Sequence, residues 1–174
     1  MVQEFGRRST VVGSGRDAVQ AVHASSRQVA DDQQIQVTVV VRRRAALPDP
    51  DPMAQVMGAA ELGEKYGADL ADLDAVTAAV TAAGARVITA DAPGRRVIVE
   101  GTYAVLKELF GVQLQQVSTA AGSFRMRTGQ LSVPQQLSGV VVAVLGLDDR
   151  DQARERVAYT AAVATSYTPV QLGD

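Results

Sequence analysis

Cysteine is absent from this chain of 174 residues, and histidine occurs only once, as His23. The missing thiols exclude disulfides, thiolate nucleophiles and thiolate metal sites. A single histidine also excludes a metal site built from several imidazoles, and it disfavours a Ser-His-Asp catalytic centre. We therefore predict no catalytic, cofactor-binding or metal-binding residue in this chain.

Aromatic residues are scarce as well, with three Phe, four Tyr and no Trp, so the core must be built mainly from Ala, Val and Leu. Hydrophobic residues still make up 47% of the chain and charged residues 21%, which is not the composition of a disordered protein. The 17 basic and 19 acidic residues leave a net charge of −2. This balance argues against a general nucleic-acid binder.

Long apolar runs are also missing. No segment approaches the roughly 20 apolar residues that a membrane-spanning helix needs. The first residues, Met1 to Phe5, lack a basic start followed by an apolar stretch, so the sequence predicts no signal peptide. We therefore expect no membrane partner.

The chain changes character twice along its length. Residues 1–34 are polar, contain Gly and Ser and show no lasting period, which predicts a flexible N-terminal arm. Residues 35–148 carry the periodic apolar patterns of a folded domain. Residues 149–174 begin highly charged and continue with small, weakly patterned residues, which predicts a linker.

Five segments of the folded domain favour β-strands. Residues 35–41 are rich in β-branched side chains and begin with alternation. Residues 85–90 and 95–100 flank an Asp-Ala-Pro-Gly turn and predict a hairpin. Residues 112–117 also alternate, and residues 124–128 are expected to return beside them as an edge strand.

Three helices are expected between these strands. Residues 57–66 form a short helix that we expect to end at Gly67 in the left-handed conformation. Asp69 is expected to cap the next helix, whose apolar stripe comprises Leu70, Leu73, Val76 and Val80. Thr102 is expected to cap a third helix, which buries Val105, Leu106, Leu109 and Phe110 and ends at Gly111.

A fourth helix is predicted near the end of the folded domain. Ser132 begins a capping-box pattern with Pro134 in the first turn, and Gly146 follows the last apolar residue. The consecutive valines at 140–142 would also suit a strand, but the cap and the terminal glycine favour a helix.

The order of elements predicts an α+β fold. Two successive βαβ units with right-handed crossovers would give a ferredoxin-like antiparallel sheet with helices on one face. The hairpin after the third helix and the C-terminal helix are additions to that unit.

Three motifs have both a functional and a structural interpretation. Residues 13–18 match part of a dinucleotide fingerprint, but no strand-bounded βαβ unit surrounds them, so we favour a flexible Gly-Ser loop. Residues 42–44 are three arginines, which fit a solvated strand end or a partner contact better than a phosphate site. Asp69, Asp72 and Asp74 fit helix capping better than a cation site.

Six short segments, in register along the chain, resemble the activation prodomain of sedolisin (kumamolisin-type) serine-carboxyl peptidases. They are residues 35–44, 66–69, 110–114, 122–129, 133–134 with 144–148, and 167–172. The last resembles the first residues that such a mature peptidase retains. No single segment is distinctive, and the match depends on all six occurring in order.

The resemblance implies a propeptide that assists folding of an acid endopeptidase, inhibits it and is removed by autoprocessing. The Ser-Glu-Asp triad of that family lies in a catalytic domain of several hundred further residues, so this chain is not expected to be an enzyme itself. The resemblance also implies calcium in the catalytic domain and an extracellular location. The partner would be the cognate catalytic domain.

The resemblance also suggests where contacts with that partner lie. A tail would cross the active-site cleft and block it, and the hairpin after the third helix would contribute to docking. The tail residues are Asp151, Arg154, Glu155, Arg156 and Val157, and the docking residues are Phe124 and Arg125. The tail departs from relatives, which often carry a proline and an aromatic residue there.

A second hypothesis belongs to a different class. The chain could be a free-standing ferredoxin-like module that binds a small ligand or forms oligomers. It would then have a ligand pocket or a stable oligomer and no affinity for a peptidase. Reading the gene beyond Asp174 would separate the two hypotheses.

Overall fold

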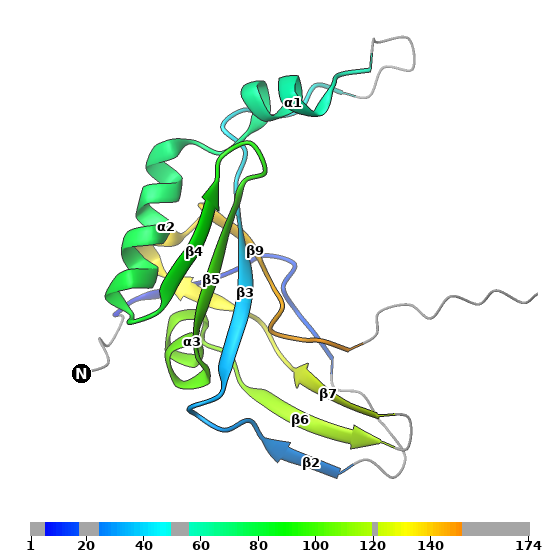
Figure 1. The fold of residues 1–174 in the computed structure, drawn as a ribbon. Helices are drawn as coiled ribbons and strands as arrows, with labels where there is room; N and C mark the ends of the chain where they lie inside the picture. The colour runs from blue at the N-terminus through cyan, green and yellow to red at the C-terminus, as the bar shows by residue number, and fades with distance from the viewer. Residues whose placement is uncertain (1–5, 18–24, 50–55, 120–121, 151–174) are drawn as a thin grey trace, which may run out of the picture.

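The computed structural model describes residues 6–17, 25–49, 56–119 and 122–150. These residues form three α-helices, one 3-10 helix (η1) and nine strands in three antiparallel sheets (Figure 1). In chain order they are β1 Arg8–Thr10, β2 Ser25–Gln28, β3 Gln34–Val41, α1 Ala59–Tyr66, α2 Leu70–Ala82, β4 Arg86–Asp91, β5 Arg96–Thr102, α3 Tyr103–Phe110, β6 Leu114–Thr119, β7 Gly122–Arg127, β8 Ser132–Pro134, η1 Gln135–Leu137 and β9 Val141–Leu145. Among the described residues, no helix has the length and apolar character needed to cross a membrane.

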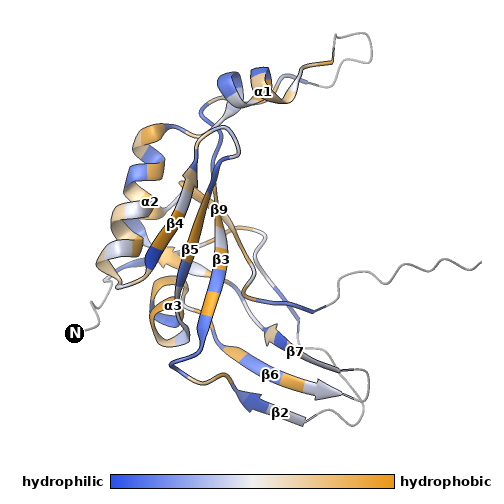
Figure 2. Cartoon of the chain, in the orientation of Figure 1, coloured by the Kyte–Doolittle hydropathy of each residue, from blue (hydrophilic) through white to orange (hydrophobic). Residues whose placement is uncertain are grey.

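The largest sheet, called the central sheet below, has the strand order β4-β5-β3-β9. Residues of β3 alternate between buried and more exposed, and Figure 2 shows the corresponding bands of apolar and polar residues. Val37 and Val39 pair with Val99 and Val97 of β5, and all four are buried. Their β-branched side chains suit a pleated, packed surface. The strand predicted at 35–41 and the hairpin predicted at 85–100 are confirmed.

Helices α2 and α3 lie on the same side of the central sheet and pack against β4 and β5 (Figure 1). They bury the apolar residues that helical periodicity predicts: Leu73, Val76, Val80, Leu106, Leu109 and Phe110. Two predicted residues are exceptions. Leu70 stands at the first position of α2 and is 66% exposed, and Val105 of α3 is only half-buried. Helix and sheet residues together form one hydrophobic core.

The predicted helix ends are largely confirmed. The Asp69 carboxylate accepts a hydrogen bond from Ala71 N–H at 3.4 Å, and the Thr102 hydroxyl accepts one from Val105 N–H at 3.5 Å. Each cap therefore satisfies a backbone donor that the first helical turn leaves free. Gly111 ends α3 with φ 58°, a left-handed conformation that costs glycine little.

Gly67 ends α1 as predicted, but the expectation of a left-handed glycine there is wrong. Its φ is −57°, so the requirement for glycine comes from packing and not from backbone conformation. A Cβ at this position would collide with the carbonyl oxygens of Gly63 and Ala92. The neighbouring Ala68 N–H donates to Ala92 O at 2.8 Å, which docks the end of α1 on the β4-β5 turn.

The prediction of a C-terminal helix at 132–145 is wrong. These residues form the short strand β8, the single turn η1 and the strand β9. Gly139 adopts φ 72°, which interrupts any helix before the valine run. Val141 and Val144 of β9 are buried because β9 pairs with β3 and completes the central sheet. Pairing with β3 therefore makes these residues a strand, although the capping-box pattern favours a helix.

The N-terminal residues contribute two strands that no local sequence pattern predicts. β1 pairs with β8, and β2 pairs with β6 to give a second sheet of order β2-β6-β7. Val11 and Val29 from this region are buried. The predicted hairpin at 112–128 is confirmed as β6 and β7, with β7 at the edge of its sheet. The domain boundaries at residues 34 and 148 stay predictions.

Candidate docking surface and exit segment

One face of the central sheet points away from α2 and α3, and we call it the open face. It is formed by the alternate residues Gln36, Thr38, Val40, Ile98, Glu100, Ala143 and Leu145. Each of these residues is half-buried or exposed, in contrast with the buried valines behind them. Leu145 is 55% exposed and lies beside Thr38, which in turn pairs with Ile98. The open face therefore has a partly apolar centre.

Two ion pairs lie on one side of that centre, along the β4-β5 hairpin. Arg96 donates to the Asp91 carboxylate at 3.0 Å, and Arg86 pairs with Glu100 across the two strands. The arginine side chains of these pairs are 56% and 72% exposed, so solvent screens both pairs. An apolar centre with a charged rim has the general layout of a protein-binding surface.

The two predicted docking residues lie on the edge strand β7. Phe124 is half-buried and pairs with Val117 of β6. The side chain of Arg125 is only 15% exposed and is engaged within the chain. Its guanidinium donates to Leu147 O at 3.0 Å and to Gly146 O at 2.8 Å. The role of Phe124 and Arg125 in docking stays a prediction, and Arg125 also has a structural role that its local sequence does not indicate.

Residues 146–150, which we call the exit segment, run beside β7. The Arg127 N–H donates to the Asp148 carboxylate at 3.0 Å, and the Arg125 N–H donates to the Asp149 carboxylate. The Asp149 N–H donates back to Arg125 O at 3.1 Å. Arg150 donates from Nε to Asp148 Oδ1 at 2.8 Å and from Nη1 to Asp17 O at 3.1 Å. Residues 149–150 belong to the predicted linker, but both contact the folded body.

Burial and hydrogen bonding act on the ionisable groups here in opposite directions. Burial by itself raises the pKa of Asp148, but hydrogen bonds from the Arg150 side chain and from the N–H groups of Arg127 and Arg150, with the charge of Arg150, lower it overall. The hydrogen bond to Asp148 raises the pKa of Arg150. Burial, followed by the nearby Arg16, lowers the pKa of Arg127.

Each of the three motifs with two interpretations contains residues with a structural role. Ser14 donates to Val11 O at 2.6 Å and accepts from Leu131 N–H at 2.9 Å, so the Gly-Ser loop joins β1 to the residues before β8. Arg42 forms a bidentate pair with Asp72, at 2.6 and 2.9 Å. The hydrogen bond to Asp72 raises the pKa of Arg42. Charge pairing and capping thus account for Asp69 and Asp72.

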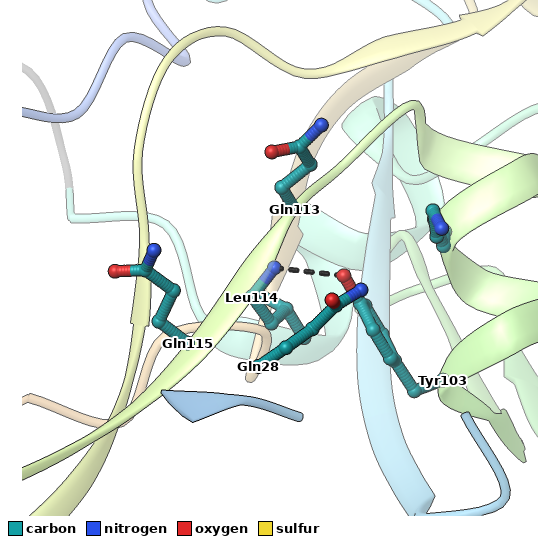
Figure 3. A pocket seen from close by; sticks show the side chains of 6 residues that line it. Gln28, Tyr103, Gln113, Leu114 and Gln115 are labelled. Atoms are coloured by element: carbon teal, nitrogen blue, oxygen red, sulfur yellow. Dashed lines mark hydrogen bonds between the residues drawn. The ribbon is translucent and has the colours of Figure 1, made fainter. Parts of the chain in front are cut away.

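A small polar pocket of about 200 Å³ lies between β2, α3 and β6 (Figure 3). Gln28, Gln113, Gln115 and Lys107 line it, together with Tyr103 and Leu114. Tyr103 is fully buried, and its hydroxyl accepts a hydrogen bond from Leu114 N–H at 3.0 Å. The hydroxyl therefore serves to hold the start of β6 on α3. In the described ranges, no group of three or more His, Cys, Asp or Glu residues could hold a metal ion.

The predicted inhibitory tail lies outside the described residues, as does His23. The roles assigned to Asp151, Arg154, Glu155, Arg156 and Val157 therefore stay predictions. The structure places the last described residue, Arg150, against β7 and the loop around Asp17.

Two comparisons show which known proteins the chain is similar to. A family model described as "Pro-kumamolisin, activation domain" matches residues 23–150. Kumamolisin from Bacillus sp. (strain MN-32) is 29% identical over 196 aligned residues, which cover 98% of this chain and 35% of kumamolisin. The chain thus spans about a third of the length of this curated relative.

Proposed function

The chain belongs to the pro-kumamolisin activation-domain family, and we propose that it acts as the propeptide of a kumamolisin-type protease. It assists folding of the catalytic domain, inhibits that domain and is removed by autoprocessing. The observation that carries the proposal is the family match over residues 23–150, which runs through β2 and the central sheet to the end of the exit segment. The catalytic triad belongs to the protease domain, so this chain contributes inhibition and not chemistry.

We further propose that the central sheet with α2 and α3 is a ferredoxin-like unit. With α1 left aside before α2, and β6 to η1 left aside before β9, the elements β3, α2, β4, β5, α3 and β9 have the chain order β-α-β-β-α-β, which supports the proposal. The strand order β4-β5-β3-β9 puts the first and third of these strands in the middle of the sheet. The β2-β6-β7 and β1-β8 sheets are additions to this unit.

The open face is the surface that we propose for docking on the catalytic domain. Its apolar centre around Leu145 and Ile98 would be buried, and the rim arginines Arg86 and Arg96 would meet acidic groups of the partner. Guanidinium groups suit this role because they make bidentate hydrogen bonds with carboxylates. The hairpin with Phe124 would extend the contact.

The tail would then lie in the active-site cleft. Because the docked body holds it there, even a weakly binding tail would occupy the cleft at a high effective concentration. Arg154 and Arg156 would pair with enzyme carboxylates, whose pKa values such pairing depresses. That contribution is present above the free carboxyl pKa and is lost as the pH falls through the depressed value. Acid would therefore release the enzyme.

Inhibition of the cognate catalytic domain by the added chain tests this proposal. We expect inhibition near neutral pH and release in acid, and we expect a chain truncated after Arg150 to bind but occlude less. Leu145→Asp should weaken inhibition about tenfold or more, since a charge would be buried in the contact. Val12→Asp is the matched control, because Val12 is 93% exposed at the turn after β1.

Other outcomes would favour the alternative. Failure of the full chain to inhibit at either pH, together with a stable oligomer or a bound small molecule, would support a free-standing module. A reading frame that continues beyond Asp174 into a catalytic domain would support the propeptide. Calcium binding by the catalytic domain and an extracellular location are parts of the same proposal, and both rest on family resemblance.

A further inference from the structure

The edge strand β7 does not offer its outer hydrogen-bonding groups freely to another strand. The N–H groups of Arg125 and Arg127 donate to the carboxylates of Asp149 and Asp148, and Arg125 O accepts from the Asp149 N–H. Side-chain carboxylates of the exit segment therefore stand where the carbonyl groups of a further strand would be. An edge covered in this way is protected from pairing with another chain.

Arg150 holds the exit segment in place against β7. Its guanidinium holds Asp148 and also reaches Asp17 O at 3.1 Å and Arg127 O at 3.3 Å. The side chains of Asp148 and Arg150 are only 7% and 15% exposed. The nearly buried carboxylate of Asp148 stays ionised because charged donors and backbone N–H groups surround it.

We propose that the exit segment is an acid-released latch on β7, closed while Asp148 is ionised and opened when that carboxylate is protonated. Three hydrogen-bond donors converge on Asp148: the Arg127 N–H, the Arg150 N–H and the Arg150 guanidinium. Protonation removes the negative charge to which all three donors bind. It also leaves an O–H group that needs a hydrogen-bond acceptor of its own.

The charged groups around Asp148 strengthen this response. They come from the loop after β1, from β7 and from the exit segment itself: Arg16, Asp17, Arg125, Arg127, Asp149 and Arg150. The guanidinium of Arg127 bonds to Ser14 O and Gly129 O and has no carboxylate of its own among the residues described. Neutralising Asp148 therefore increases the excess of positive charge and removes the attraction that offsets the mutual repulsion of the arginines.

The direction of the pH dependence follows from the same contacts. The latch lowers the pKa of Asp148 relative to an open segment. Its contribution is therefore fully present above the ordinary carboxyl pKa and is lost as the pH falls through the lowered value. Arg150 stays charged throughout, since its pKa is raised. The latch needs no partner, so it operates whether or not the chain inhibits a protease.

Amide hydrogen exchange of the full 174-residue chain, followed by NMR between neutral pH and about pH 2, tests the latch. Protection factors correct for the intrinsic pH dependence of exchange. We expect the Arg127 amide to lose protection by about fivefold or more in acid, since a bond to an ionised acceptor is roughly twice as strong as one to a neutral acceptor. The amides of β5 should keep theirs and show that the body remains folded.

Two variants separate the latch from a general effect of acid. Asp148→Asn keeps an oxygen acceptor but carries no charge, so the Arg127 amide should be less protected at neutral pH and show no acid transition. Asp91→Asn is the matched control, because Asp91 also accepts from a backbone N–H and an arginine, at 3.1 and 3.0 Å, but in the β4-β5 turn. It should leave the transition at Arg127 unchanged.

Three results would overturn the latch. The first is unchanged protection of the Arg127 amide down to about pH 2, below the ordinary carboxyl range. The second is an acid transition that persists in Asp148→Asn. The third is loss of protection at Arg127 and across β5 together, which would mean global unfolding. None of these measurements involves a protease, so their outcome is independent of the inhibition experiment.

Discussion

In the central sheet, valines of β3 and β5 pack against α2 and α3. Around β7 and the exit segment, by contrast, arginines make most of the hydrogen bonds. The first region is stabilised by apolar burial, which has little directional preference and is insensitive to pH. The second depends on directed, charge-assisted hydrogen bonds, which need ionised carboxylates. One chain thus combines a body that should tolerate acid with a periphery that should respond to it.

Removing a large side chain from each region tests this difference most strongly. Phe110 on α3 is 1% exposed, so Phe110→Ala should lower the free energy of unfolding by about 3–5 kcal/mol. Phe124 on β7 is half-buried, and the same substitution there should cost clearly less. Denaturant unfolding of both variants measures the two losses. A loss below about 1 kcal/mol for Phe110→Ala would contradict the placement of α3.

The N-terminal region provides the next largest effect. Arg8 on β1 donates to Glu108 O at 2.7 Å, to Leu109 O at 3.0 Å and to Ser132 O at 2.7 Å. It therefore connects β1 to β8 and to the C-terminal end of α3. The helix dipole of α3 also favours a cation at that end. Arg8→Met keeps part of the side-chain bulk but removes these bonds, and it should cost about 2 kcal/mol.

The exposed neighbour Arg7 provides the control for this substitution. Its carbonyl oxygen accepts a bond from Gln135 N–H, which Arg7→Met leaves in place. The control should therefore stay within about 0.5 kcal/mol of the parent chain. Equal stability of the Arg8→Met and Arg7→Met variants would mean that the N-terminal residues are only loosely docked, as their composition suggests.

Prediction from the sequence succeeded where periodicity and capping decide the structure. The strands β3, β4 and β5, the helices α2 and α3 and their caps at Asp69 and Thr102 follow from local patterns. β1 and β2 were not predicted because they have three and four residues and exist only through pairing with β8 and β6. No local pattern reports a partner more than eighty residues away in sequence for such a short segment.

β9 shows how two local signals can conflict. The capping-box pattern at Ser132 predicts a helix, while the valine run at 140–142 suits a strand, and pairing with β3 decides for the strand. At the candidate site, sequence reasoning singled out Arg125 but not its contacts with residues 146–149, because those contacts depend on the course of the chain after β9. Asp148 ends the predicted folded domain and Arg150 lies in the predicted linker, and no local pattern predicts that the two bind each other against β7.

The smallest expected effect comes from an exposed ion pair in the body itself. Arg86 and Glu100 pair across β4 and β5, but their side chains are 72% and 36% exposed. Water screens their attraction, and ordering two long side chains costs entropy that offsets the remainder. A double-mutant cycle with Arg86→Gln and Glu100→Gln should therefore give a coupling energy below about 0.5 kcal/mol, and added salt should reduce it further. A coupling above about 1.5 kcal/mol would contradict the view that burial alone holds the central sheet, and charge would then matter in both regions.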